Sequence, residues 1–402
     1  MTYFFFYWLL KITAKLYFKK IRVYDYENVS PNKPLIICAN HGNSFMDAVL
    51  MAVIFKRNLH FLARADAFNT PFKRWFLGKI NMMPVYRIRD GREVVKNNDA
   101  IFDRCQQILE NNGAILIFPE GNCVVEKRLR TFKTGFVQMA FASKMQNLQV
   151  LPVTINYSNP LEFYSEVSFQ FQNQIDVNLI KEETQNDYIS FSKLLLSKTI
   201  VGISHQMLIL PEIEDGFYEQ ALEINLNNLK VGFVTSQLHV IKELDHMRLT
   251  DSILFEDLKI KTANYFKHLN QLNINDEVVV EGSIINPFIS ILVIPFYFLI
   301  KAIHYLPATL VSFIINKKIK QLQFKGAVRM ILGMFVYLIY TSIFLIVSVQ
   351  FLGFFNSIIF MLIFFNPYVY NRLTITYKSI RKKEFLPKLL DLRKEIIGNF
   401  NL

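Results

Sequence analysis

Residues 330–370 contain no charged side chain, and this run constrains the fold of the chain more than any other feature. A helix needs about 20 apolar residues to cross the hydrocarbon core of a bilayer. The run has a soft break around Gly353, which divides it into two predicted transmembrane spans, at about 330–349 and 352–370. We therefore expect the chain to enter a membrane through a helical hairpin.

Basic residues flank this run on both sides. They are Lys317, Lys318, Lys320, Lys325 and Arg329 before it, and Arg372, Lys378, Arg381, Lys382 and Lys383 after it. The positive-inside rule then places both ends in the cytoplasm, with a very short external loop. The earlier apolar stretch, 284–315, is interrupted by prolines, and we expect a re-entrant or interfacial hairpin there rather than two further spans. Residues 284–402 are thus predicted to be membrane segments with a basic tail.

The charge of the chain is concentrated beside these apolar segments. The formal net charge is +12, and residues 284–402 hold 14 Lys and Arg against 3 Asp and Glu. This pattern favours anionic lipid headgroups as the partner and disfavours nucleic acid, which is usually bound by a charged face of a folded domain. Three cysteines without a CxxC spacing predict neither zinc nor disulfides, as expected for a catalytic part that faces the cytosol.

The first 30 residues combine aromatic side chains with lysines. The apolar run is too short to span a bilayer, and it has neither a preceding basic region nor a cleavage site of the kind found in signal peptides. We predict that residues 1–30 form an amphipathic helix at the membrane interface, with Lys11, Lys15, Lys19 and Lys20 reaching toward the headgroups. A first helix packed against the core is the alternative.

Residues 31–177 alternate between strand and helix patterns. The predicted strands cover 35–39, 59–63, 82–86, 115–118 and 150–157, with an edge strand within 167–177; the predicted helices cover 44–55, 71–75, 93–111 and 134–144. Such alternation indicates an α/β domain with a mostly parallel sheet flanked by helices. Residues 178–283 are polar and predicted to be a helical insertion or cap, to which the sequence assigns no role.

His41 lies in the turn between the first of these strands and the helix that follows. Asp47 lies in the first turn of that helix, close enough in space to touch the histidine. A neutral imidazole can take a proton from an alcohol when an acceptor holds its other nitrogen, and a carboxylate is such an acceptor. The alternatives are a structural histidine, and a capping box in which Ser44 and Asp47 stabilise the start of the helix.

A second turn, Phe118-Pro119-Glu120-Gly121, follows the strand predicted at 115–118. It brings Glu120 and neighbouring amides to the edge of the sheet. Basic side chains come soon after it and after another strand: Lys127, Arg128, Arg130 and Lys133 in one loop, and Arg87, Arg89 and Arg92 in the other. Beside the amino end of a helix they predict a phosphate site. A simple turn and a solvated charged loop are the alternatives.

Four blocks, in this order, resemble the glycerolipid acyltransferase family of lysophosphatidic acid and glycerol-3-phosphate acyltransferases. They are NHGNSFMD, MPVYR, IFPEG with its basic run and FKTG, and VLPVTINY, and they cover about residues 36–157. The resemblance implies that His41 is the general base and Asp47 its partner. It assigns Arg87, Glu120 and Gly121, with Phe118 and Pro119 in the same turn, to the acceptor site, and Pro152 to the last block.

Two features depart from the family's pattern. Five residues, Gly42 to Met46, separate His41 from Asp47, whereas the usual spacing is shorter by one residue; some glycerol-3-phosphate acyltransferases share the longer form. The usual arginine after the glycine of the FPEG turn is replaced by Asn122-Cys123-Val124. Arg128, Arg130 or Lys133 is then expected to bind the phosphate.

These expectations describe a membrane acyltransferase of phospholipid synthesis, integral to the cell membrane with its catalytic domain facing the cytoplasm. An acyl chain would pass from acyl-CoA or acyl carrier protein to a hydroxyl of glycerol 3-phosphate, which the longer spacing slightly favours, or of lysophosphatidic acid. Neither a metal nor a redox cofactor is implied, nor a covalent acyl-enzyme. The alternatives are a lysophospholipid remodelling acyltransferase or transacylase, and a non-catalytic lipid-binding protein. A lipid esterase would need a Gly-x-Ser-x-Gly elbow, which the sequence lacks.

Overall fold

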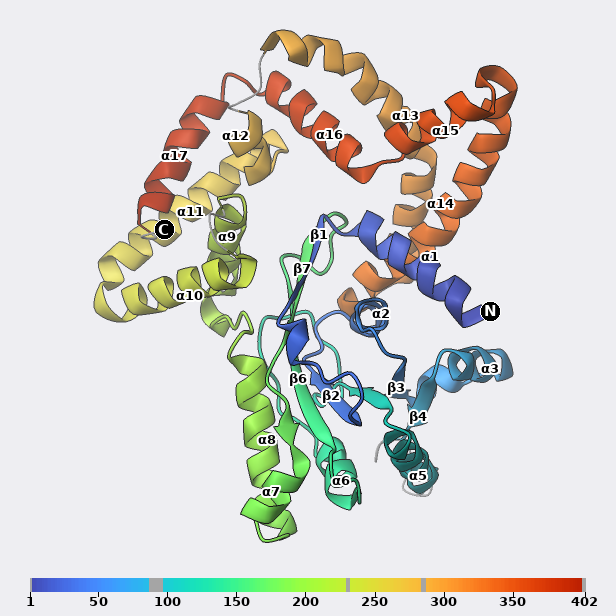
Figure 1. The fold of residues 1–402 in the computed structure, drawn as a ribbon. Coiled ribbons are helices and arrows are strands. Elements are labelled where there is room, and N and C mark those ends of the chain that lie inside the picture. Colours follow the sequence, from blue (N-terminus) through green and yellow to red (C-terminus); the bar gives the residue numbers. More distant parts are fainter. Residues whose placement is uncertain (1, 87–96, 229–231, 283–286, 400–402) are drawn as a thin grey trace.

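The computed structural model describes residues 2–86, 97–228, 232–282 and 287–399. Its centre is an eight-stranded mixed sheet (Figure 1). The strands are β1 (Lys20–Tyr24), β2 (Leu35–Ala39), β3 (Leu59–Arg64), β4 (Met82–Val85), β5 (Ala114–Ile117), β6 (Gln149–Tyr157), β7 (Glu166–Phe171) and β8 (Ile175–Asp176). They lie in the order β1-β7-β6-β2-β5-β3-β4, with β8 also paired to β6, and only the pairs of β6 with β7 and β8 are antiparallel. The predicted fold class is confirmed.

Strand β2 is buried on both faces because it lies in the middle of this sheet. Leu35 and Ile37 point to one side, where they join a core cluster with α2 (Phe45–Ile54) and α1 (Thr2–Tyr17). Ile36 and Cys38 point to the other side. There they meet a cluster built by α5 (Asn97–Glu110), α6 (Gly135–Ala142) and α8 (Tyr188–Ser204). Helices on both faces explain why this strand is a continuous apolar run rather than an alternating one.

Residues 2–30 form a helix, a strand and a short 3-10 turn, so the prediction of one helix over residues 1–30 was wrong in extent. Helix α1 ends at Tyr17, and β1 pairs in parallel with β7, where Arg22 binds Glu166 at 2.8 Å. The edge strand predicted within 167–177 is therefore an inner strand, β7, because β1 covers its outer side. Helix α1 buries Ala14 in the core, as the alternative of a core-packed helix requires, and exposes Trp8, Ile12 and Leu16 on another face. Its location at a membrane interface stays a prediction.

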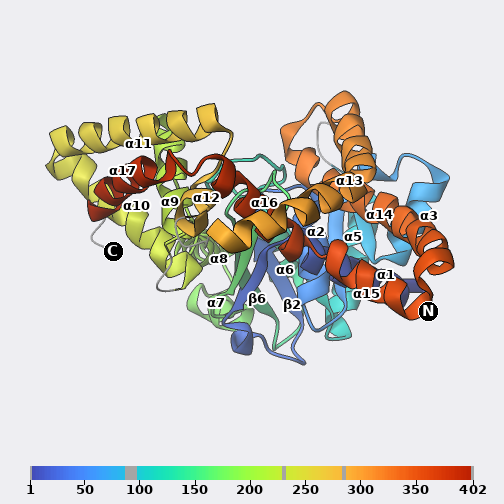
Figure 2. The ribbon, with the colours of Figure 1, turned by 90° about the horizontal axis from the view of Figure 1, so that it is seen from above.

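The helical part predicted at 178–283 is indeed helical, and the end of the chain completes it. It comprises α7 (Val177–Glu183), α8, α9 (Asp215–Leu226), α10 (Phe233–Thr250), α11 (Ser252–Leu272) and α12 (Asp276–Gly282). Helix α17 (Leu386–Gly398), from the predicted basic tail, packs beside α11 (Figure 2). Its Arg393 binds the fully buried Asp276 with Nε 2.8 Å from Oδ1. The tail is thus part of a folded core.

Four further helices carry the apolar segments: α13 (Pro287–Lys318), α14 (Leu322–Leu352), α15 (Phe354–Phe364) and α16 (Pro367–Arg381). Among the described residues, Val293–Lys318 and Leu322–Leu352 are long and apolar enough to cross a membrane. The hairpin expected within 284–315 is instead one continuous helix that contains Pro295 and Pro307, since apolar helices tolerate proline when neighbouring helices pack against them.

The second predicted span, 352–370, is broken near its end. Helices α15 and α16 are bent by 58° relative to each other, with the break at Asn366 and Pro367. Proline disfavours helical geometry at the residue before it and lacks an N–H donor, so a helix ends there. Together the pair is apolar enough for a third, bent span.

The amino end of α14 packs closely against the loop that follows β6. Gly326 allows this approach, because a Cβ atom at this position would lie 2.2 Å from the carbonyl oxygen of Pro160 and 3.2 Å from Oδ1 of Asn43. The hydroxyl of Tyr17 donates to the carbonyl oxygen of Gly326 at 3.3 Å. A helix with membrane-spanning length thus touches the turn that carries His41.

We predict that Gly326→Ala lowers the free energy of unfolding by about 1–3 kcal/mol, the range for overpacking, because backbone atoms must move to admit the new methyl group. Gly333→Ala is the matched control, since the same helix has open space around Gly333. Thermal unfolding of the full chain in detergent would measure both. Equal midpoints for the two variants would contradict the close contact.

Candidate active site

The turn between β2 and α2 is anchored to the neighbouring strand β6. Asn40 makes a pair of hydrogen bonds with the backbone of Ile155: its Nδ2 donates to the carbonyl oxygen at 2.9 Å, and its Oδ1 accepts from the amide at 2.7 Å. The side chain continues the ladder of hydrogen bonds after β2 has ended at Ala39. His41 follows directly and is thereby held at the carboxyl edge of the sheet.

His41 and Asp47 are in contact, with Nδ1 of the imidazole 2.8 Å from Oδ2 of the carboxylate. Asp47 is fully buried. Its Oδ2 also accepts from the amide of Asn43 at 2.9 Å, and its Oδ1 accepts from the hydroxyl of Tyr157 at 2.6 Å. An ionised carboxylate only accepts hydrogen bonds, so the contact has the geometry that an Nδ1–H tautomer of His41 would use. In that tautomer Nε2 is the ring nitrogen without a proton.

The predicted capping box does not form. Ser44 has φ 50° and ψ −140°, and its side chain makes no capping hydrogen bond. Its amide donates to Sγ of Cys123 at 2.8 Å, and the carboxylate of Asp47 turns toward His41 and Asn43 instead. The acid in the first turn of α2 therefore contacts His41 and Asn43 and does not cap the helix, two arrangements that the spacing alone did not distinguish.

The turn after β5 lies against the same histidine. The ring of Phe118 stacks on the imidazole of His41 with centroids 4.0 Å apart and planes 13° from parallel. The buried Glu120 accepts from the amide of His41 at 2.9 Å through Oε1, and from Nε of Arg130 at 2.6 Å through Oε2. Gly121 has φ 68°, which is strained for other residues. Phe118 and Glu120 thus both contact His41.

The Glu120–Arg130 pair joins the basic loop to this turn. Burial raises the pKa of Glu120, and the nearby Arg130 guanidinium offsets part of that effect. Arg130 also donates through Nη2 to the carbonyl oxygens of His41, at 3.4 Å, and of Asn122. One cation of the predicted phosphate site therefore lies beside the histidine.

Of the other predicted cations, Lys127 and Arg128 turn toward the helical part, whereas Lys133 lies against the Gly121 turn, with its Cγ 3.4 Å from where a Cβ atom on Gly121 would be. Arg128 binds Asp215 of α9 at 2.8 Å, and Lys127 binds Glu219 of the same helix at 3.1 Å, so both tie the loop to the helical part. The side chain of Lys133 is exposed, while its amide donates to the carbonyl oxygen of Pro119 at 2.7 Å. Arg87 lies outside the described residues. Pro152 lies opposite Cys38 in the pairing of β6 with β2, so it lies within the sheet and not in the turn that carries His41.

Sequence reasoning did not assign Tyr157 or Cys123 to this cluster. Tyr157 is the last residue of β6. Its position at the carboxyl end of a predicted parallel strand could have placed it near His41, because the carboxyl ends of adjacent parallel strands meet at one edge of a sheet. Burial and the Asp47 carboxylate raise the pKa of Tyr157, which keeps its hydroxyl a donor. Burial also raises the pKa of Cys123 to about 12, so this thiol stays protonated and is a poor nucleophile.

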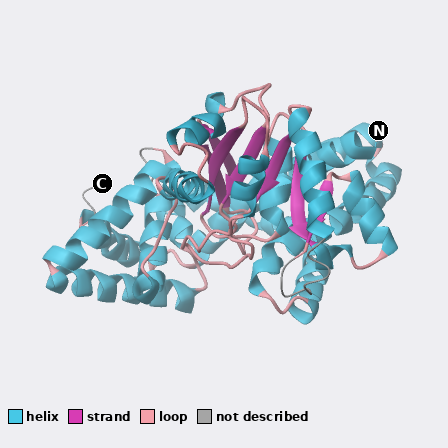
Figure 3. Ribbon diagram, turned by 90° about the horizontal axis from the view of Figure 1, so that it is seen from below, coloured by secondary structure: helices cyan, strands magenta, loops and turns pink. Residues whose placement is uncertain are grey.

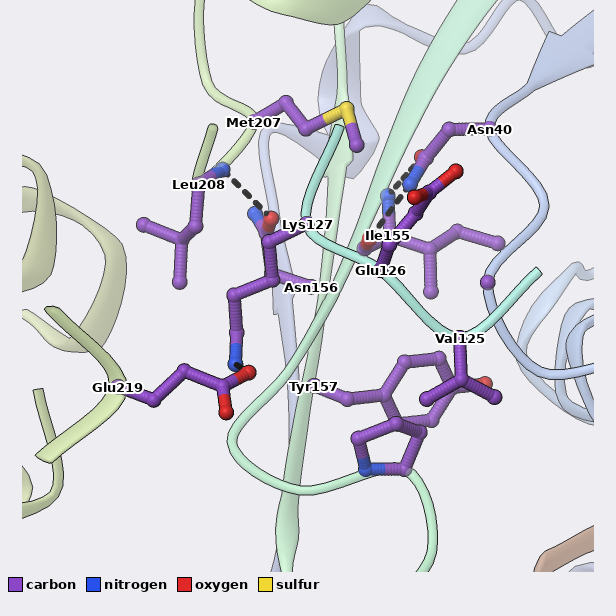
Figure 4. A pocket seen from close by; sticks show the side chains of 12 residues that line it. Asn40, Val125, Glu126, Lys127, Ile155, Asn156, Tyr157, Met207, Leu208 and Glu219 are labelled. Carbon is purple, nitrogen blue, oxygen red and sulfur yellow. Dashed lines mark hydrogen bonds and ion pairs between the residues drawn. The ribbon is translucent and has the colours of Figure 1, made fainter. Parts of the chain in front are cut away.

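A cavity of about 60 Å³ lies where the α/β part meets the helical part (Figure 4). Asn40, Gly42, Tyr157 and Pro160 line it from the side of the His41 turn. Lys127, Leu208 and Glu219 line it from the opposite side, and the Lys127–Glu219 ion pair is visible at its rim in Figure 4. Tyr157 therefore contacts both the buried Asp47 and this cavity.

The sheet with its buried carboxylate–histidine pair is compatible with an enzyme of acyl transfer. Comparisons with known proteins point to the same class of enzyme. Residues 20–156 match the family model described as Acyltransferase. The matched region contains nearly all of the four blocks, so it supports their resemblance to an acyltransferase family.

Named relatives are similar to about a third of this chain. The chain is 27% identical over 139 residues to a chloroplastic 1-acyl-sn-glycerol-3-phosphate acyltransferase of Arabidopsis thaliana, with 34% of this chain and 36% of that protein covered. It is 26% identical over 150 residues to a probable 1-acyl-sn-glycerol-3-phosphate acyltransferase of Mycoplasma pneumoniae, with 36% and 53% covered. The chain thus spans between about a third and a half of the length of these relatives.

A solved structure is also similar, that of the 1-acyl-sn-glycerophosphate acyltransferase PlsC from Thermotoga maritima. The sequences are 21% identical, the TM-score is 0.33, and the match covers 47% of this chain and 78% of that one.

We predict that Tyr157→Phe destabilises the protein by about 1.5–3 kcal/mol, because it removes a hydrogen bond to a buried charge. It should also lower kcat/KM for acyl transfer about tenfold or more, equivalent to ~1.4 kcal/mol, since Asp47 then holds the imidazole less firmly. Thermal unfolding and initial rates would measure the two effects.

Tyr218→Phe provides the matched control. The hydroxyl of Tyr218 donates to Oδ1 of Asp245 at 2.7 Å in the helical part, so this variant should lose stability without losing turnover. If Tyr157→Phe and Tyr218→Phe had the same activity, the hydroxyl of Tyr157 would have no role in positioning Asp47.

Proposed function

We propose that this protein is a membrane acyltransferase that moves a fatty acyl chain from an acyl thioester to a hydroxyl of a glycerol-phosphate acceptor. The observation that carries this proposal is the contact of 2.8 Å between His41 and the buried Asp47 at the carboxyl edge of the sheet. The acyltransferase domain at residues 20–156 supports it. So do the two helices with membrane-spanning length.

In this reaction His41 acts as the general base. Its Nε2 removes the proton of the acceptor hydroxyl as that oxygen forms a bond to the thioester carbonyl carbon. The carbon–sulfur bond then breaks, and the imidazolium returns the proton to the departing thiolate. Asp47 stabilises the imidazolium and keeps the ring oriented. A positioned general base contributes about 10²–10⁴-fold to a rate. The reaction needs no metal or redox cofactor.

The acceptor phosphate is proposed to lie against the turn that contains Phe118, Pro119, Glu120 and Gly121. Arg130 is the predicted cation whose guanidinium contacts the backbone of His41, so we propose it as the main phosphate ligand. Lys133 and Arg87 are proposed as further ligands. Arg128 pairs with Asp215 of α9 and so points away from this turn, which favours a role in joining the loop to the helical part.

The names of the relatives favour 1-acylglycerol 3-phosphate as the acceptor, whereas the longer His41–Asp47 spacing favours glycerol 3-phosphate. We propose the former as the acceptor to test first. The donor is proposed to be acyl-CoA or acyl carrier protein, and the site is proposed to face the cytoplasmic leaflet of the cell membrane. Contact of α14 with the His41 turn supports a lipid substrate, because it keeps the site beside a candidate membrane span.

The test is acyl transfer by isolated membranes that carry the full chain. Labelled acyl-CoA or acyl carrier protein is offered with 1-acylglycerol 3-phosphate, glycerol 3-phosphate or a lysophospholipid. We expect product with a glycerol-phosphate acceptor, and a loss of about 10²-fold or more in His41→Ala and of similar order in Asp47→Asn. His239→Ala, at an exposed position of α10, should retain full activity.

Two results would contradict the proposal. Full activity of His41→Ala would mean that this histidine is not the base. A correctly folded protein that forms no product with any donor and acceptor would favour a non-catalytic lipid-binding protein, and transfer to a lysophospholipid alone would favour a remodelling enzyme.

A further inference from the structure

Helix α3 (Pro71–Lys79) leaves its aromatic side chains uncovered. None of its residues is buried, and Phe72 and Trp75 are 70% and 58% exposed. A helix at the surface of a soluble domain normally turns such side chains toward the core. Here the helix stands out from the sheet at the periphery of the α/β part (Figure 1). Two large aromatic rings one turn apart on an open helix indicate a surface that something else covers.

The charge on α3 identifies what kind of surface would cover it. The helix has the sequence PFKRWFLGK, with three basic residues and no acidic one. Lys73, Arg74 and Lys79 are all exposed. Aromatic rings prefer the boundary between headgroups and acyl chains, and nearby lysines and arginines are attracted to anionic headgroups. The combination fits a lipid surface.

Helix α3 is also next to the membrane side of the molecule. Phe76 of α3 contacts Phe6 of α1, with ring centroids 5.9 Å apart. Trp8, Ile12 and Leu16 form the exposed stripe on α1, 45%, 54% and 48% exposed. Helix α1 in turn packs against α14, and Figures 1 and 2 both show α3, α1 and α14 on one side. The surface of α3 therefore continues toward a candidate membrane span.

We propose that α3 lies in the headgroup layer of an anionic membrane, with Phe72 and Trp75 inserted toward the acyl chains and Lys73, Arg74 and Lys79 at the lipid phosphates. The helix follows the carboxyl end of β3, which is parallel to β5, and β5 is parallel to β2. Figure 3 shows the strands of the sheet in the middle of the molecule, with helices around them. Docking of α3 thus holds the sheet edge that carries His41 to the membrane, in addition to the attachment through α14.

The tryptophan content of the chain permits a direct test. Trp8 and Trp75 are its two tryptophans, so Trp8→Phe leaves Trp75 as the single reporter. The full chain is reconstituted into vesicles of phosphatidylcholine and phosphatidylglycerol with brominated acyl chains, which quench tryptophan at short range. We expect Trp75 to lose most of its emission relative to vesicles without bromine.

The matched control places a tryptophan far from the proposed surface. Leu179 is 62% exposed on α7, a helix at the end of the molecule opposite α13–α16 (Figure 1). In a variant with Trp8→Phe, Trp75→Phe and Leu179→Trp, the emission should not change with brominated lipid. If brominated lipid quenched Trp75 no more than it quenched this control, the proposal would be overturned. Helix α3 would then contact a protein partner or water.

A second variant tests the charge. Lys73→Glu, Arg74→Glu and Lys79→Glu are added to Trp8→Phe, and quenching is compared in vesicles with and without phosphatidylglycerol. We expect the parent to be quenched more strongly in the anionic vesicles and the charge-reversed variant to lose that difference. If charge reversal left quenching in anionic vesicles unchanged, attraction to anionic headgroups would be overturned.

Discussion

The site depends on a carboxylate that is held in the protein interior. A buried charge is strongly destabilising unless hydrogen bonds replace its hydration. Three groups lie within 2.6 to 2.9 Å of the carboxylate oxygens of Asp47: Nδ1 of His41, the amide of Asn43 and the hydroxyl of Tyr157. Two of these belong to the turn after β2, and the third ends β6. Because β2 and β6 are parallel neighbours, their carboxyl ends bring all three together, and the fold of the sheet thereby fixes the orientation of the histidine.

The neighbour on the other side of β2 supplies the second half of the arrangement. Strand β5 pairs with β2, and the turn after it provides the ring that stacks on His41 and the carboxylate of Glu120, which binds the backbone of His41. Arg130 bridges the two turns. The close approach of α14 at Gly326 adds a helix of membrane-spanning length to the same turn. His41, Arg130 and the amino end of α14 therefore meet at the end of one central strand.

The sequence predicted correctly those features that depend on residues close together in the chain. The apolar run Leu35–Ala39 became β2 as predicted, and the expected contact of His41 with Asp47 is present. The errors concern features that distant partners determine. Residues 20–24 form a strand because β7 and Glu166 pair with them. Arg128 is drawn away by Asp215, 87 residues later in the chain, and Tyr157 reaches Asp47 across 110 residues. No pattern within a short window contains such information.

The central claim is that Asp47 holds His41 with the proton on Nδ1 and leaves Nε2 as the base. Nitrogen NMR of the full chain, labelled in the imidazole rings, measures this directly. The chain has 7 histidines, and His41→Gln assigns the signal of His41. We predict that near neutral pH Nδ1 of His41 is protonated and Nε2 is not, and that Asp47→Asn abolishes this preference. A histidine with its proton on Nε2 in the unaltered protein would contradict the account, because that nitrogen could not then accept a proton from the acceptor hydroxyl.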